Sequence, residues 1–270
     1  MSVLIATQGW NYAAWVGPFY PLGTRPAEFL PIYARAFRGV EVDSSFYAVP
    51  DARAVQAWAA RTPRDFTFAL KMPQEITHER RLADADDVLG TFLDRARELG
   101  PKLGPILMQM GPDFAPEELP ALERFIPGLP KDLRFAVEVR QSRWMRPEVL
   151  PNLLELLSNY GVALALSDGR WVRRETMLEL AERPTADFHY VRWMGPDRSI
   201  TDYSHLQFDR SEEIGSWAEV LKQVAHTRDV YGFFNNHFAG HSPANAREMQ
   251  RLLGQEPVDP ATLGPQRSLF

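Results

Sequence analysis

Two stretches decide the fold, Gly39-Val40-Glu41-Val42-Asp43 and Phe135-Ala136-Val137-Glu138-Val139-Arg140. Each alternates charged and apolar residues with the two-residue period of a β-strand. The apolar side of each strand is expected to meet a layer of helices, which leaves the charged side chains facing the other way. Ionisable groups are costly to bury unless they are paired or used. The two stretches therefore predict strands whose charged ends form a polar site.

The same unit, a short strand followed by a helical segment, recurs about eight times. Strands are predicted at residues 3–8, 39–43, 66–71, 103–108, 134–138, 162–168, 188–192 and 230–235. Helices are predicted near residues 25–37, 51–61, 87–99, 116–125, 147–159, 174–181, 211–225 and 242–253, with Thr24 and Ser242 as caps before prolines. Eight such units predict an α/β fold, a single TIM-type (β/α)8 barrel with parallel strands and an outer helix ring.

No break in composition divides the chain. Residues 1–255 are predicted to form one TIM-like barrel domain, and residues 256–270, rich in proline and polar residues, an irregular tail. A doubly wound open sheet is the competing architecture. It usually has a glycine-rich turn after its first strand, and residues 8–12, Gln-Gly-Trp-Asn-Tyr, do not form one.

Composition narrows the class of protein. With 270 residues, 45% of them hydrophobic, the chain can bury a large core. The absence of cysteine excludes disulfides, iron–sulfur clusters, thiolate zinc sites and a cysteine nucleophile. A net charge of −5 disfavours a broadly basic surface for nucleic acid. The first residues lack a signal peptide's features and no apolar run reaches the ~18–20 residues of a membrane span. A cytoplasmic protein that does not bind membranes is expected.

A parallel barrel collects its strand ends on one face, where barrel enzymes have their active sites. Four acids and three bases are expected to converge there: Glu41, Asp43, Glu138 and Asp168 with Lys71, Arg140 and Arg192. Paired carboxylates beside a base allow acid–base catalysis, because neighbouring charges push the pKa of one carboxyl up and the other down. In this hypothesis Glu138 and Glu41 are the acid and base and Asp168 orients them. The alternative is an ion-pair plug that closes the barrel and satisfies itself.

Other candidates lie in the loops. His78, after the third strand, is a further acid–base candidate, and the loop at 234–243 contributes Asn235, Asn236 and His241 where barrel enzymes often bind phosphate. A capped loop held by its asparagines is the alternative there. His237 and His241 are four residues apart, but no carboxylate accompanies them, so no metal and no other cofactor is predicted. Trp10, Tyr12, Tyr47 and Trp144 are predicted to stack on a sugar or base, although loop packing explains such aromatics as well.

Several motifs resemble those of the YecE-like family, the domain of unknown function 72. They are Gly9-Trp10-Asn11-Tyr12, Trp15, Gly17-Pro18-Phe19-Tyr20-Pro21, the stretches at 40–47, 68–71, 76–78 and 99–105, Glu138-Val139-Arg140, Ser142, Trp144, Tyr190-Val191-Arg192, Phe234-Asn235-Asn236 and Asn245. The resemblance covers nearly the whole chain. It implies a TIM barrel and no known activity. The family usually has Asn where this chain has Asp43, and His where it has Gln141 and Met194.

The leading hypothesis is a metal-independent acid–base enzyme, a hydrolase or lyase, acting on a sugar- or nucleotide-like small molecule that carries a phosphate. Lys71, Arg140 and Arg192 would then hold its negative charge. The alternative is a non-catalytic barrel that binds single-stranded or damaged nucleic acid, with affinity that falls steeply as salt rises. A third interpretation is a barrel kept for protein partners, with its mouth plugged and dry.

Overall fold

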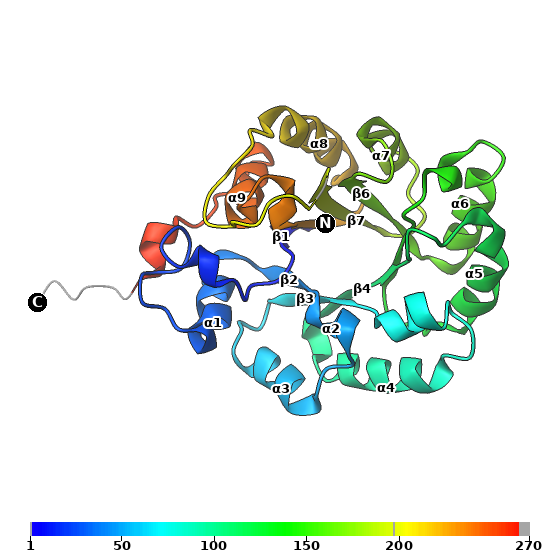
Figure 1. The fold of residues 1–270 in the computed structure, drawn as a ribbon, viewed down its shortest axis with the longest axis horizontal. Helices are drawn as coiled ribbons and strands as arrows, with labels where there is room; N and C mark the ends of the chain where they lie inside the picture. The colour runs from blue at the N-terminus through cyan, green and yellow to red at the C-terminus, as the bar shows by residue number, and fades with distance from the viewer. Residues whose placement is uncertain (1, 197, 265–270) are drawn as a thin grey trace, which may run out of the picture.

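The computed structural model describes residues 2–196 and 198–264, and its centre is a sheet of eight parallel strands (Figure 1). They are β1 (Val3–Thr7), β2 (Gly39–Val42), β3 (Thr67–Lys71), β4 (Leu103–Gln109), β5 (Phe135–Glu138), β6 (Ala163–Gly169), β7 (Phe188–Gly195) and β8 (Asp229–Phe234). Their hydrogen-bonded order is β1-β8-β7-β6-β5-β4-β3-β2. The two ends of this ladder meet at a single isolated bridge between Gln8 and Glu41. The predicted TIM-type barrel is thus confirmed, in a nearly closed form.

Helices surround the barrel in chain order (Figure 1). They are α1 (Pro26–Ala36), α2 (Ser44–Tyr47), α3 (Ala52–Ala60), α4 (Asp86–Arg97), α5 (Leu119–Phe125), α6 (Leu150–Tyr160), α7 (Arg174–Ala181), α8 (Ser211–Val224) and α9 (Ser242–Leu252). Eight of these fall where helices are predicted, within three residues at each end. The four-residue α2 and a π-helical turn at Glu75–Glu79 are not predicted, because neither is long enough to show a helical period.

The two predicted helix caps are wrong by one residue. Arg25 precedes α1, and its backbone N–H donates to the Glu28 carboxylate (3.0 Å). Ser242 is the first residue of α9, where its hydroxyl donates to Asn236 Oδ1 (2.8 Å) instead of capping its own helix. The α1 helix thus begins one residue nearer its proline than the cap pattern predicts, and α9 begins one residue farther from its proline.

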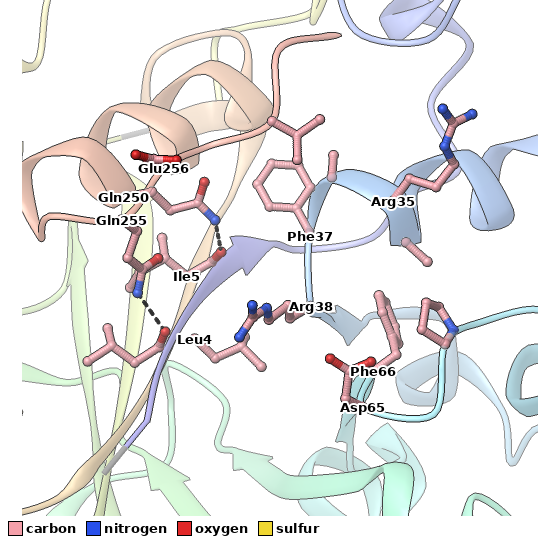
Figure 2. A pocket seen from close by; sticks show the side chains of 15 residues that line it. Leu4, Ile5, Arg35, Phe37, Arg38, Asp65, Phe66, Gln250, Gln255 and Glu256 are labelled. Atoms are coloured by element: carbon pink, nitrogen blue, oxygen red, sulfur yellow. Dashed lines mark hydrogen bonds between the residues drawn. The ribbon is translucent and has the colours of Figure 1, made fainter. Parts of the chain in front are cut away.

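Side chains complete the seam between β1 and β2, where the backbone ladder is missing. Gln250 of α9 donates to the Ile5 carbonyl (3.0 Å), and Gln255 donates to the Val3 carbonyl (2.8 Å), beside a cavity of about 570 Å³ (Figure 2). The buried Tyr33 hydroxyl bonds backbone groups at the ends of both strands. These bonds satisfy carbonyl groups that a closed ladder would otherwise pair.

Residues 256–264 follow α9 as an irregular strap with one 3₁₀ turn, Pro260–Leu263. Leu263 is buried, and Arg35 of α1 donates to its carbonyl (2.9 Å). The last part of the predicted tail, residues 265–270, lies outside the described residues. No helix in the described part of the chain has the length and apolar character needed to cross a membrane.

Side-chain alternation along the strands separates an apolar outer layer from a polar interior. On the outer side Trp193 stacks on Phe234 (ring centroids 4.1 Å apart) and meets Trp217 of α8 edge to face. Arg192, one residue earlier in β7, points into the barrel, where it reaches Glu41 of β2. The charged side chains, which occupy every second position of these strands, therefore point into the barrel, as the two-residue period of a strand predicts.

Candidate active site at the barrel mouth

An ion-pair network joins three strands inside the barrel. Arg192 donates through Nε to Glu41 Oε2 (2.9 Å) and through Nη2 to Glu41 Oε1 (2.6 Å), and its Nη1 pairs with Glu138. Arg140 donates through Nε to Glu138 Oε1 (2.6 Å), and the Tyr190 hydroxyl donates to Glu41 Oε2 (2.7 Å). Every oxygen of the two carboxylates therefore has a charged partner.

The network is cut off from solvent. Glu41 and Glu138 are 0% exposed and Arg192 is 1% exposed. Burial alone would raise the pKa of the Glu138 carboxyl, but Arg140 and Arg192 outweigh it and lower that pKa to about 2. Burial opposes the charge of Arg192 as well, yet the two carboxylates raise its pKa well above its ordinary value. Glu138 and Arg192 thus remain charged at neutral pH.

A cavity of about 330 Å³ lies at the carboxyl ends of the strands, and Arg140 and Arg192 form part of its wall. Its size is in the range of small-molecule sites. The residues that line it are Gln8, Tyr12, Asp43, Tyr47, Lys71, Gln109, Arg140, Arg170, Trp171, Arg192, Met194, Gly195, Arg198, Asn235 and His237. Among these described residues five side chains are cationic and one is a carboxylate, so the wall favours an anionic ligand.

Lys71 is the wall's buried amine. Its Nζ lies 3.6 Å from the centroid of the Phe46 ring, and the residue is 8% exposed. Burial, followed by the charge of Arg192, lowers the pKa of Lys71 to about 8. No carboxylate in residues 2–196 or 198–264 forms an ion pair with it, and Glu41 pairs with Arg192 instead. A share of the amine is therefore neutral near physiological pH.

The structure brings most of the predicted site residues together. Lys71, Arg140, Arg192, Tyr12, Tyr47 and Asn235 line the cavity, while Glu41 and Glu138 lie beneath it. The acid and base roles of the two glutamates stay predictions, and their saturated contacts favour a positioning role. His78 lies behind the wall, in contact with Thr77 (2.8 Å) and Gln109 (3.4 Å). Burial, followed by the charge of Lys71, lowers the pKa of His78.

Asp168 does not face the cavity, which corrects its predicted place beside Glu41 and Glu138. Its Oδ2 accepts from Trp217 Nε1 of α8 (2.8 Å) and from Arg174 Nε of α7 (2.6 Å). The strand register explains this, since Ser167 pairs with Arg192 on the inner side. The next residue therefore points outward to the helices. Asp168 joins helices to the sheet.

Three predicted ligand-binding residues also lie away from the cavity. Trp144 is 0% exposed and donates to the Phe114 carbonyl (2.8 Å). Asn236 Oδ1 accepts from the Ser242 backbone (3.1 Å) and hydroxyl, and His241 Nδ1 lies 2.8 Å from a backbone carbonyl. The loop at 234–243 is therefore largely the capped turn of the alternative interpretation, and loop packing explains Trp144.

Trp10 lines a neighbouring cavity, where it meets Trp58 edge to face (5.8 Å). That cavity shares Tyr12 and Asp43 with the central one. Of the four aromatics predicted to stack on a ligand, Tyr12 and Tyr47 thus reach the central wall. Binding of nucleic acid stays a prediction.

The sequence interpretation misses three wall residues, Gln8, Arg170 and Trp171, whereas Gln109 and Arg198 lie on the face where a polar strand end and a loop base are expected. Gln8 and Gln109 end strands, and this position is their signal in the sequence. Asp43 and Met194, two of the three departures from the family pattern, also line the cavity. Gly195 is required beside them, because its φ is +79° and a Cβ there would lie 2.1 Å from the His237 carbonyl oxygen. This contact fixes the loop after β7 against the loop after β8.

The donor groups of the described residues do not form a metal site. No group of three His, Asp or Glu side chains within residues 2–196 and 198–264 is placed to hold a metal ion. The side-chain groups at the mouth that can take part in chemistry include an amine, a carboxylate, amides, phenols, guanidinium groups and the His237 imidazole.

Comparison with known proteins now adds to the geometry. The model of a family described as "Protein of unknown function DUF72" matches residues 4–268. The chain belongs to the DUF72 family. UPF0759 protein YecE of Escherichia coli K12 is 34% identical over an alignment of 271 positions, which covers 94% of this chain and 92% of YecE. UPF0759 protein YunF of Bacillus subtilis is 27% identical over 255 residues, 88% of this chain and 90% of YunF. The predicted family resemblance is confirmed.

Solved structures agree with the family assignment and the fold. A DUF72 protein from Thermotoga maritima has a TM-score of 0.76 and 25% identity, over 94% of this chain and 100% of that chain. D-psicose 3-epimerase from Clostridium cellulolyticum has a TM-score of 0.55 and 10% identity, over 94% of this chain and 97% of the epimerase. At that identity the epimerase shares the fold, and nothing about activity follows from it.

Proposed function

We propose that the protein is a metal-independent acid–base enzyme acting on a small, sugar-like molecule that bears a phosphate. The observation that carries the proposal is the charge of the cavity wall, five cationic side chains against one carboxylate. Active sites of barrel enzymes lie at this end of the strands. A cavity of about 330 Å³ accommodates a monosaccharide phosphate better than a nucleic-acid strand.

In this proposal the buried network holds the cationic wall in position. Glu41 and Glu138 fix the guanidinium groups of Arg192 and Arg140 without entering the cavity. Such preorganised donors stabilise negative charge that develops on a substrate. Arg140 and Arg198 are the proposed phosphate ligands, since both line the cavity and Arg198 forms no ion pair with a carboxylate among residues 2–196 and 198–264.

Proton transfer is assigned to Lys71 and Asp43, which line the cavity. The lowered pKa of Lys71, about 8, suits a group that gives up and regains a proton near neutral pH. Asp43 is the carboxylate among the described wall residues, where it can accept a proton from a bound molecule and return it. In a lyase these groups would remove a proton from the carbon beside a carbonyl and protonate the group that leaves; in a hydrolase they would take a proton from the attacking water and return it to the leaving group.

The test is a screen of phosphorylated sugars in D₂O, read by proton NMR for exchange or product formation. Lys71→Met is expected to lower turnover of any substrate found by about 10²-fold or more. Lys222→Met is the matched control, because Lys222 is half exposed on α8 and pairs with Glu219 (3.6 Å). Full turnover by the Lys71→Met protein, with the control also active, contradicts the proposed function.

A further inference from the structure

We propose that Lys71 is a covalent nucleophile, and that the substrate is an aldehyde or ketone whose carbonyl carbon forms an imine with Nζ. This inference rests on the proposed function, because it uses the same cavity. It narrows the substrate class to open-chain sugar phosphates or other phosphorylated carbonyl compounds. It also assigns Lys71 a bond to the substrate, beyond holding charge or moving a proton.

The chain has four lysines, Lys71, Lys102, Lys131 and Lys222, and their contacts and burial distinguish Lys71, since Lys131 is exposed to solvent. Lys102 Nζ donates to the Ala59 carbonyl (2.6 Å) and the Thr62 carbonyl (2.8 Å), so its donors are used in packing. Lys222 pairs with Glu219 at the surface. Lys71 has neither kind of partner among the described residues, and its amine meets the face of Phe46 (3.6 Å to the centroid).

Two nearby carboxylates, Glu41 and Glu138, are occupied by other partners, and Asp43 shares the cavity wall with Lys71 without forming an ion pair with it among the described residues. Glu41 is fully engaged by Arg192 and Tyr190, and Glu138 by Arg192 and Arg140. A lysine in an apolar site beside other cations loses its proton easily and becomes a nucleophile. The lowered pKa of Lys71 agrees with this geometry. Lys71 is one of the residues that line the cavity, so a molecule bound there lies beside it.

The chemistry balances without an added reagent. The neutral amine forms a bond to the carbonyl carbon, while the π electrons move to the oxygen and an amine proton follows. The resulting carbinolamine then loses its C–O bond, with a second proton, as water. The products are the imine and one water molecule, and nothing is oxidised or reduced. A protonated imine withdraws electrons from the neighbouring carbon, which prepares a C–H or C–C bond there for cleavage.

Reductive trapping tests the proposal. Wild-type protein is incubated with D-glyceraldehyde 3-phosphate and sodium cyanoborohydride, digested, and mapped by mass spectrometry over all four lysines and the amino terminus. We expect one reduced adduct at Lys71, at least tenfold above each other lysine, and suppressed by inorganic phosphate. Unphosphorylated glyceraldehyde is expected to label Lys71 at least tenfold more slowly.

The variants and outcomes separate the two proposals. Lys71→Met is expected to lose the adduct and Lys222→Met to keep it, and the wild-type map decides the question even where a variant folds poorly. An adduct spread evenly over the lysines, or absent from Lys71, overturns the covalent role. If calorimetry with inorganic phosphate still shows binding, the proposed function survives that result. If phosphate does not bind either, both proposals fall.

Discussion

Replacing Arg192 by methionine is the sharpest perturbation of the barrel interior. The change removes three charge-assisted hydrogen bonds, two to Glu41 and one to Glu138. Both carboxylates are 0% exposed, so each is left buried with less compensation. Breaking a buried ion pair from one side costs about 3–5 kcal/mol. Since the unfolding free energy of most domains is about 5–15 kcal/mol, Arg192→Met is expected to lose a large part of the protein's unfolding free energy.

Urea unfolding followed by circular dichroism measures this loss. The matched control is Arg198→Met, an exposed cation of the same cavity wall, which is expected to change the unfolding free energy by less than about 0.5 kcal/mol. Adding Glu41→Gln and Glu138→Gln to Arg192→Met is expected to restore part of the stability, because neutral amides cost less to bury than carboxylates. If Arg192→Met lowers the unfolding free energy by less than about 1 kcal/mol, the stabilising role given to the ion-pair network is refuted.

The pKa of Glu138 is about 2 in the folded protein against an ordinary 4.5, so its ionised carboxylate stabilises the fold above pH 4.5, and this stabilisation is lost as pH falls toward 2. Urea unfolding across that pH range should therefore show a weaker pH dependence of the unfolding free energy for Glu138→Gln than for wild type, and equal pH dependence counts against the assignment. Lys71 binds its proton less tightly in the folded protein, where its pKa is about 8 against an ordinary 10.5. Lys71→Met is therefore expected to have a higher unfolding free energy than wild type at pH 7, by about 1 kcal/mol, and this difference should shrink toward pH 10. A difference in unfolding free energy that does not change with pH contradicts the prediction. Gln250→Leu should cost about 1–3 kcal/mol by leaving the Ile5 carbonyl without its donor, whereas Glu256→Gln, beside the same cavity, should be neutral by thermal unfolding. Gly195→Ala should destabilise the protein by about 1–3 kcal/mol and weaken phosphate binding in calorimetry, because the added Cβ meets the His237 carbonyl; unchanged binding argues against that loop contact.

The barrel and the core of its site are predictable because the strands alternate. In β2 and β5 apolar residues separate the charged ones, so the side that faces the interior is evident from the sequence, and Glu41, Glu138 and Arg140 are found where it indicates. The strand that contains Asp168 is apolar on both sides, Ala163 to Leu166, so its period does not show which way the last residue points. The pairing register of β6 with β7 also shifts between Asp168 and Gly169, so strand pairing does not indicate the direction of that side chain either.

Loop residues are harder to assign because their side chains are placed by contacts distant in the sequence. Trp144 is fixed by Phe114, 30 residues earlier, and Asn236 accepts from Trp15, 221 residues away. No pattern in the neighbouring sequence predicts either of these two hydrogen bonds. Arg170, Trp171 and Arg198 reach the cavity from loops after β6 and β7, and strand period carries no information about them. Their contribution to the positive wall is evident only in the folded protein.

The most direct test of the central claim, that the strand ends form a binding site for a phosphorylated small molecule, is a crystal structure determined after soaking in millimolar inorganic phosphate. The expected result is one phosphate in the cavity lined by Lys71, Arg140 and Arg198, with its oxygens within hydrogen-bond distance of at least two of these side chains. A cavity that holds only water, with phosphate bound elsewhere or not at all, would contradict the account.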